Sequence, residues 1–281
     1  MSNPRITALV HTRNEEANLP QCLASLTWAD EMVVADMAST DTTREIAAKL
    51  GARVIEVPMA DCVEKVRNQA IDACTGDWIL ILDADETIAP GLVSQLPGLM
   101  AQSDGVGAYA LPRKNYFLGV WLEHGLWPDH QVRFIRRGKV RWSGLVHELP
   151  EVGGEMVRLK PDPEAALEHF GHAPNLKWYM DKMARYAPMD AQRLAATSRP
   201  AVWPYMIRRP VGEFCGRYFA CGAWRHGMEG LVWSLVAANY QLQVCLHYWA
   251  AHRDEVKLAP ETVRKQIKRE IWREAFKWLR H

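Results

Sequence analysis

The chain has 281 residues, a net charge of +1 and 48% hydrophobic residues. This length fits one large domain or one domain with an appendage, and the composition is that of an ordinary globular protein. A nearly neutral charge argues against general nucleic-acid binding, so we expect no nucleic-acid partner. The six cysteines show no Cys-x-x-Cys spacing, which predicts neither a zinc site nor disulfides and favours a cytoplasmic location.

Strand-like and helix-like segments alternate in the first third of the chain. The expected strands cover 6–10, 31–35, 53–57 and 78–82, and the expected helices between them cover 18–26, 42–50 and 63–74. Asn18 is expected to cap the first helix, and Thr42 with Glu45 has the spacing of a capping box for the second. This alternation is typical of βαβ units and a parallel sheet flanked by helices.

The stretch Trp78-Ile79-Leu80-Ile81-Leu82-Asp83-Ala84-Asp85-Glu86 reads as a strand buried on both faces that ends in carboxylates. Ligands of α/β sheets bind at the carboxyl ends of the strands. Carboxylates crowded there repel one another unless a cation lies between them, and hard divalent cations prefer oxygen ligands. The alternative is an ordinary turn with solvated acids.

Three expected strand ends meet at one edge of such a sheet. His11 to Glu15 follow the first strand, Asp36 follows the second, and Asp83 to Glu86 follow the fourth. Together with Arg13 and Arg67 they could bind a metal ion and a diphosphate. The sequence holds no G-x-G-x-x-G and no P-loop, so dinucleotide and P-loop binding lose their main support.

The second half of the chain changes character. Residues 107–111 and 131–136 are expected to be strands, 113–130 an irregular aromatic segment, and the chain from 174 onward helical. Residues 230–251 carry no full charge, and we expect them to lie in a bundle or a membrane interface rather than to span a membrane. The basic, aromatic tail 253–281 suits an anionic membrane surface. The alternatives for the tail are a cover for the core and a contact with a second copy of the chain.

Several motifs occur in order: Asn14-Glu15-Glu16, Val34-Ala35-Asp36 followed by Ser39-Thr40-Asp41, Arg67-Asn68-Gln69-Ala70 and Leu82-Asp83-Ala84-Asp85-Glu86. This ordered set resembles family 2 glycosyltransferases. Within that family, Trp127-Pro128-Asp129, Arg133-Phe134 and Val146-His147-Glu148 resemble the bacterial lipopolysaccharide core β-1,4-glucosyltransferases. The motifs cover roughly residues 5–170.

The resemblance implies a GT-A fold, a mostly parallel twisted sheet flanked by helices. It suggests a transferase domain over 1–172 and a helical, membrane-associating or oligomerising region over 173–281. It further implies a UDP-sugar donor, a divalent metal (Mg²⁺ or Mn²⁺), inversion at the anomeric carbon and a lipid-linked saccharide acceptor. The expected location is the inner face of the cytoplasmic membrane, with homo-oligomerisation through the C-terminal helices as a further expectation.

The resemblance also assigns roles to residues of the donor site. His11, Arg13 and Glu15 match the first-strand exit that binds the nucleoside, Asp36 the acid at the uracil edge, Arg67 a basic residue near the nucleotide, and Asp83 the acid on the ribose. Two departures bear on this site. Met37-Ala38 replaces the more usual Ser-Gly after Asp36, and Thr42 stands where glycine is common, which leaves the conformation of this loop open.

The resemblance also assigns residues to the metal ion, the donor sugar and the catalytic base. Asp85 is the expected metal ligand of the Asp-x-Asp motif and a catalytic residue, and His169 matches the histidine that completes the metal site. Gly125 falls in the loop that approaches the donor sugar. Glu148 is the preferred catalytic base, with Asp129 as its alternative. Two other functions remain: a nucleotidyltransferase, and a non-catalytic nucleotide-sugar-binding membrane protein.

Overall fold

The computed structural model describes residues 4–144, 149–173, 175–197, 202–254 and 259–278. The chain divides into two compact units. The sheet unit contains Met1–Asn115 and Pro128–Gly171, and the helical unit contains Tyr116–Trp127 and His172–His281. The helical unit thus resumes next to the expected boundary at 172, and it also includes the segment 116–127, which the sequence had placed in the transferase domain.

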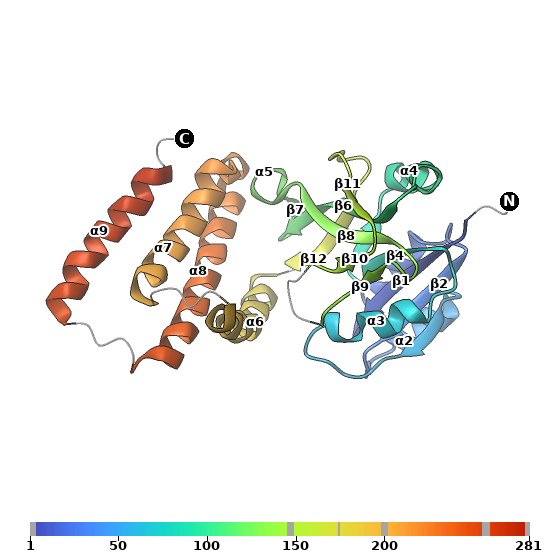
Figure 1. The fold of residues 1–281 in the computed structure, drawn as a ribbon, viewed down its shortest axis with the longest axis horizontal. Helices are drawn as coiled ribbons and strands as arrows, with labels where there is room; N and C mark the ends of the chain where they lie inside the picture. Colours follow the sequence, from blue (N-terminus) through green and yellow to red (C-terminus); the bar gives the residue numbers. More distant parts are fainter. Residues whose placement is uncertain (1–3, 145–148, 174, 198–201, 255–258, 279–281) are drawn as a thin grey trace. The chain divides into compact units, whose positions relative to one another are not determined.

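The sheet unit is built on one twisted mixed sheet (Figure 1). Its strand order is β3-β2-β1-β4-β8-β6-β12-β5, with β11 paired to β6. The strands are β1 (Ile6–Thr12), β2 (Glu31–Asp36), β3 (Arg53–Glu56), β4 (Trp78–Asp83), β5 (Glu86–Ile88), β6 (Val106–Phe117), β8 (Asp129–Arg136), β11 (Glu155–Arg158) and β12 (Leu167–Ala173). A small hairpin-like pair joins β9 (Val140–Arg141) to β10 (Glu151–Val152). The first four strands run parallel, as expected, whereas β8 is antiparallel to both β4 and β6.

Strand β4 lies in the middle of the sheet because both of its faces are apolar. Trp78, Leu80 and Leu82 pack into the core on one face, with α1 (Leu19–Ala24), α2 (Thr43–Lys49) and α4 (Pro90–Ala101). Ile79 and Ile81 pack into the core on the other face, with α3 (Glu64–Asp72). The alternating side chains of a strand place successive residues on opposite faces, so an unbroken apolar run needs cover on both. The buried strand predicted from the sequence is confirmed.

Neither of the two predicted side-chain helix caps forms. Asn18 and Thr42 do precede their helices, but neither side chain caps its helix. The Asn18 amide donates to Glu15, and the Thr42 hydroxyl donates to Glu16 at 2.7 Å. The capping-box prediction was wrong because Glu16, distant in sequence, takes the place of Glu45. The bond between Thr42 and Glu16 attaches the loop after β1 to the start of α2.

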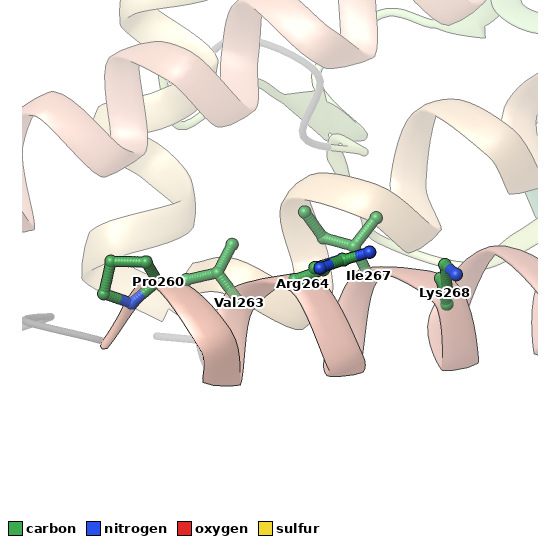
Figure 2. A pocket seen from close by; sticks show the side chains of 5 residues that line it. All are labelled: Pro260, Val263, Arg264, Ile267 and Lys268. Carbon is green, nitrogen blue, oxygen red and sulfur yellow. The ribbon is translucent and has the colours of Figure 1, made fainter.

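The helical unit is a bundle with a short β-segment attached. Its helices are α5 (Glu123–Leu126), α6 (Leu176–Thr197), α7 (Val202–Cys215), α8 (Gly227–His252) and α9 (Pro260–Trp278), and the strand β7 (Val120–Trp121) pairs with the end of β6. Helix α8 packs against α6 and α7, and α9 packs against α7. Within the described parts of the chain, no helix is long and apolar enough to cross a membrane. Figure 2 shows an open pocket along α9. The side chains that line this pocket include neither an acid nor a histidine.

The expected irregular segment 113–130 is largely regular. Strand β6 extends to Phe117, well beyond the predicted end at 111, and β8 begins at Asp129. Phe117 and Leu122 are fully buried among Tyr179, Met183 and Trp233 of the helical unit. This packing explains why the segment 116–127 groups with the helices.

Candidate active site

The carboxyl ends of the parallel strands bring the predicted donor residues to one edge of the sheet. In the register of the strands, His11 lies beside Asp83, and Thr12 lies beside Asp36. The two pairs therefore stand one residue apart along neighbouring strands. The convergence that the sequence predicts for these strand ends is found in the structure.

Polar atoms at this edge are buried without protein partners in the described part of the chain. They are both ring nitrogens of His11, the Thr12 hydroxyl, Asp36 Oδ1 and Arg67 Nε. Each buried polar atom without a hydrogen bond costs about 1–3 kcal/mol. A folded protein tolerates several of them together most readily where a ligand supplies the missing partners. The cluster is therefore a candidate polar ligand site.

Two of these buried residues, His11 and Asp36, lie on the neighbouring strands β1 and β2. Burial, followed by the nearby Arg67 guanidinium, lowers the pKa of His11 to about 3. The imidazole is therefore neutral at physiological pH, with one nitrogen able to donate and the other to accept. Asp36 is fully buried, and its Oδ2 accepts the backbone N–H of Ser39 at 3.0 Å. Its Oδ1 is left for a donor on a ligand.

Arg133 holds together the acids that follow β4. Its guanidinium donates to both oxygens of Asp83 and, at 3.1 Å, to Glu86. Arg113 donates to the same Glu86 oxygen at 2.6 Å. Although burial opposes it, the attraction of Arg133 and then Arg67 lowers the pKa of Asp83 below its usual range, so this carboxylate stays charged. The ionised carboxylate is then available to accept hydrogen bonds from a ligand on its exposed side.

Three guanidinium groups in this network face four carboxylates, which leaves a net charge of about −1. The members are Arg67, Arg113, Arg133, Asp83, Asp85, Glu86 and Asp129. Because the network is slightly negative, it can bind a divalent cation without strong charge repulsion. The arginines can in turn offset the negative charge of a bound diphosphate. The donor set thus suits a metal ion together with a phosphorylated ligand.

Asp85 and His169 lie next to each other, as predicted for the metal site. His169 Nε2 is 3.4 Å from Asp85 Oδ2, and the Phe170 backbone N–H donates to the Asp85 carbonyl at 3.1 Å. A Cβ at Gly171 would meet Asp85 Oδ2 at 1.9 Å, so only glycine allows this approach. Within the described residues, no group of three or more His, Cys, Asp or Glu side chains could hold a metal. One carboxylate and one imidazole fit Mg²⁺ or Mn²⁺ when substrate phosphates and water complete the coordination.

Asp129, the alternative base, accepts four hydrogen bonds. Its Oδ2 accepts from Arg113 Nε and Nη2 and from Asn115 Nδ2, and its Oδ1 accepts from Gln131 at 2.8 Å. Burial alone would raise its pKa, but Arg113 and these hydrogen bonds lower it to about 2. Such a carboxylate binds a proton weakly, which disfavours it as a general base. Glu148, the preferred base, and His147 lie outside the described residues.

The loop after β2 has a left-handed residue at Ala38, where glycine is more usual. Ala38 has φ +55°, and Asn14 in the facing loop also has φ +55°. The Asn14 N–H donates to Ser39 Oγ at 2.9 Å, and its side-chain oxygen accepts the Thr40 N–H at 2.8 Å. Arg13 is exposed beside this junction, and Glu15 Oε2 accepts from Asn18. The nucleotide-binding roles of Arg13 and Glu15 stay predictions.

Gly125 is held by the helical unit. It has φ +108°, and a Cβ there would meet the Trp233 ring at 2.8 Å. The Arg217 guanidinium lies over that ring at 4.4 Å and donates to the Gly125 carbonyl at 3.5 Å. The His124 backbone N–H donates to His226 Nε2 at 2.9 Å. These contacts explain the glycine, and its predicted approach to the donor sugar stays a prediction.

No individual role was expected for Arg113, Arg133 or Asn115, and Glu86 was expected only as one of the acids after the fourth strand. Arg113, Arg133, Glu86 and Asn115 are all buried or nearly so. For Arg133, a charge inside an expected strand was an available signal, because a buried charge requires a partner. Arg113 and Asn115 fall in the segment expected to be irregular, which carried no such signal. The side chains that they contact lie 14 to 54 residues away, and only the strand register shows which residues meet.

Comparisons with known proteins show the family to which the chain belongs. The model of the family "Glycosyl transferase family 2" matches residues 7–147. The chain belongs to this family and is a glycosyltransferase, so the nucleotidyltransferase and non-catalytic alternatives are set aside. Its sheet flanked by helices is the GT-A architecture expected of such an enzyme.

Among individual relatives, the chain is 28% identical over 262 residues to the lipopolysaccharide core biosynthesis glycosyltransferase LpsC of Rhizobium meliloti, covering 88% of this chain and 93% of that protein. It is 45% identical over 180 residues to a TPR repeat-containing protein of Synechococcus elongatus, covering 60% of this chain and 42% of that one.

Matches among solved structures include the following two. One is S. aureus TarS 1-349 in complex with UDP, with 14% identity, 91% of this chain and 93% of that chain covered, and a TM-score of 0.48. The other is the mannosyltransferase PcManGT of Pyrobaculum calidifontis in complex with GDP-Man and Mn²⁺. It has 16% identity, covers 99% of this chain and 88% of that chain, and has a TM-score of 0.45.

Proposed function

We propose that this glycosyltransferase transfers a hexose from a UDP-sugar to a lipid-linked saccharide, with a divalent metal ion and inversion at the anomeric carbon. The observation that carries the proposal is the position of the Asp85–His169 pair, with atoms 3.4 Å apart, at the sheet edge where His11, Asp36 and Arg67 keep buried unpartnered atoms. The proposed metal ligands and the proposed nucleotide-binding groups thereby lie at the same edge of the sheet.

Each group at this edge can meet one part of a uridine diphosphate. Asp36 Oδ1 can accept the N–H of a uracil ring, and the neutral His11 can donate to or accept from the nucleoside. Asp83 is ionised and only partly buried, so it can accept a ribose hydroxyl while Arg133 holds it. Arg67 lies on the same edge as a cation for the phosphates.

Asp85 and His169 would hold the metal ion, and the bound ion would neutralise charge on the departing diphosphate, an effect of several kcal/mol. Inverting transfer needs a carboxylate on the face opposite the leaving group, to take the proton of the acceptor hydroxyl. We assign this role to Glu148. The four hydrogen bonds to Asp129 and its low pKa argue against the alternative.

A turnover assay tests the proposal. The purified protein is given UDP-, GDP- and dTDP-sugars with Mg²⁺ or Mn²⁺ and a lipid-linked saccharide acceptor, and nucleotide release and sugar transfer are measured. Asp85→Ala should lower kcat at least a hundredfold, because several kcal/mol of charge stabilisation are lost. Asp61→Ala, which removes an exposed acid paired with Lys65, serves as the control. Metal-dependent transfer that survives Asp85→Ala would contradict the site assignment. In the same assay Glu148→Gln should abolish transfer while UDP still binds.

We further propose that the acceptor belongs to a lipopolysaccharide core and that the enzyme works at the inner face of the cytoplasmic membrane. The relative LpsC supports the acceptor class by its name and by its coverage of nearly the whole chain. Helix α9 supports the location. It carries six Lys or Arg against three Glu, and Trp272 stacks on Phe276 at 5.4 Å with both rings largely exposed. Exposed aromatic rings among basic side chains suit the interface of an anionic membrane.

A further inference from the structure

Asn115 lies between Asp129 and His169 on three neighbouring strands, β8, β6 and β12. Its Nδ2 is 2.9 Å from Asp129 Oδ2, and its Oδ1 is 2.7 Å from His169 Nδ1. We propose that Asn115 is a positioning residue that keeps His169 in the Nδ1–H tautomer, with Nε2 directed toward Asp85, and thereby sets the affinity for the divalent metal. This inference rests on the metal-binding role proposed for Asp85 and His169.

The orientation of the Asn115 amide follows from Asp129. Asp129 Oδ2 already accepts two N–H groups of Arg113, so this oxygen belongs to an ionised carboxylate, which can only accept. The Asn115 atom that faces it at 2.9 Å must then be the NH2 group, because two oxygens at that distance would repel. The carbonyl oxygen of the same amide therefore points at His169.

The tautomer of His169 follows in the same way. Asn115 Oδ1 has no hydrogen to give, so a separation of 2.7 Å from His169 Nδ1 requires a proton on that nitrogen. Asp85 Oδ2 is farther away, at 3.4 Å from Nε2, a distance that two atoms can keep without a hydrogen between them. In the neutral ring Nε2 then carries the lone pair that a metal ion requires.

The arrangement matches what metal-binding histidines need. The second ring nitrogen of such a histidine usually donates to a neighbouring oxygen, which fixes the ring and raises its basicity. Asn115 and His169 are both buried, and they stand on adjacent strands of the sheet. Their geometry is therefore set by the sheet rather than by a loop. Without Asn115, the Asp85 carboxylate would be the stronger acceptor and would draw the proton to Nε2.

Nitrogen-15 NMR of metal-free protein labelled at histidine tests the tautomer directly, at a pH where the imidazoles are neutral. The protonated and unprotonated ring nitrogens have well-separated shifts, and the His169 signals are those lost in His169→Gln. We expect the proton on Nδ1 in the wild type and a shift of the population toward Nε2–H in Asn115→Leu. A wild-type His169 protonated on Nε2 would overturn the inference.

Mn²⁺ binding in the presence of UDP, followed by electron paramagnetic resonance of the free ion, tests the consequence. Asn115→Leu should raise the dissociation constant ten- to a hundredfold. Asn68→Leu is the matched control, because Asn68 also makes two hydrogen bonds, at 2.8 and 3.0 Å, to the backbone of Trp142. It should lose stability without a change in Mn²⁺ affinity or in the His169 tautomer.

A double variant separates the loss of the hydrogen bond to His169 from a general folding defect. In Asn115→Asp/Asp129→Asn the carboxylate and the amide exchange places, so an acceptor for the His169 Nδ1–H remains. We expect the tautomer to persist and the Mn²⁺ affinity to stay within about threefold of the wild type. If Asn115→Leu kept the wild-type Mn²⁺ affinity while His169→Gln lost it, the positioning role of Asn115 would be overturned and the proposed metal site would stand. Wild-type affinity in both Asp85→Ala and His169→Gln would overturn the proposed metal site and, with it, the predicted effect on affinity.

Discussion

Arg133 fixes the place of the acids that follow β4. The carboxylates of Asp83 and Glu86 both accept hydrogen bonds from the buried Arg133 guanidinium, which offsets the repulsion between them. Removing one member of such a buried set costs about 3–5 kcal/mol, because a charge is left without a partner. The carboxylates are therefore preorganised before any ligand arrives. Asp85, between them in sequence, faces His169 instead.

Ala38 is a strained residue at the edge of the donor site. Its φ of +55° belongs to the left-handed region, which costs a residue with a Cβ about 1–2 kcal/mol. Glycine avoids this cost but loses more chain entropy on folding, about 0.5–1 kcal/mol. We expect Ala38→Gly to raise the free energy of unfolding by about 0.5–1 kcal/mol in urea denaturation. Ala48→Gly, at an exposed position inside α2, should lower it by about 1 kcal/mol. A loss of stability in both variants would show that Ala38 is unstrained.

At the scale of the elements, β2 is tied to its neighbours by Glu31 at the end opposite the site. This carboxylate accepts from the Thr7 hydroxyl at 2.6 Å, from Arg53 at 2.7 Å, and from the N–H and hydroxyl of Thr75, both at 2.9 Å. Burial raises its pKa, but these hydrogen bonds outweigh that effect and lower it to about 2. The folded sheet thus favours the ionised form.

Glu31 should make the stability of the sheet unit depend on pH. Its folded pKa lies below the unfolded value of about 4.3, so its contribution is complete above that value and is lost as the pH falls toward 2. Glu31→Gln should therefore lower the urea midpoint at pH 7, and the difference from the wild type should shrink at pH 3. Glu164→Gln, an exposed acid of the same unit, is the control. A difference that stays constant between the two pH values would contradict this role.

The elements also show what a sequence can reveal. The apolar run of β4 and the acids after it were predictable, because a two-sided strand and a ligand edge each leave a local pattern. The end of β6 was not. Arg113, Lys114 and Asn115 resemble a loop because they are polar, and they are polar because they pair with acids inside the unit. Such pairs depend on the register between antiparallel strands, and this register cannot be read from a short stretch of sequence.

At the scale of the whole molecule, the chain passes from one unit to the other in the middle of a strand. Asn115 ends the first part of the sheet unit, and the next residue, Tyr116, begins a segment that is packed among the helices. The residue that we propose to orient His169 is thus covalently joined to the segment in which Gly125 contacts α8.

The exposed aromatic pair on α9 should bind the protein to anionic membranes. Burying the exposed surfaces of Trp272 and Phe276 would stabilise the bound state by about 1–2 kcal/mol each, and the basic residues of the helix add attraction. Trp272→Ser/Phe276→Ser should therefore lower partitioning into vesicles containing phosphatidylglycerol at least tenfold in a sedimentation assay. Met59→Ser removes an equally exposed apolar side chain from the sheet unit and should change nothing. The wild-type protein should also dissociate as salt rises, because surface charges are screened. Equal partitioning of the wild type and the α9 variant would show that this helix faces something other than a membrane, and the variant's oligomeric state would then be the measurement to compare.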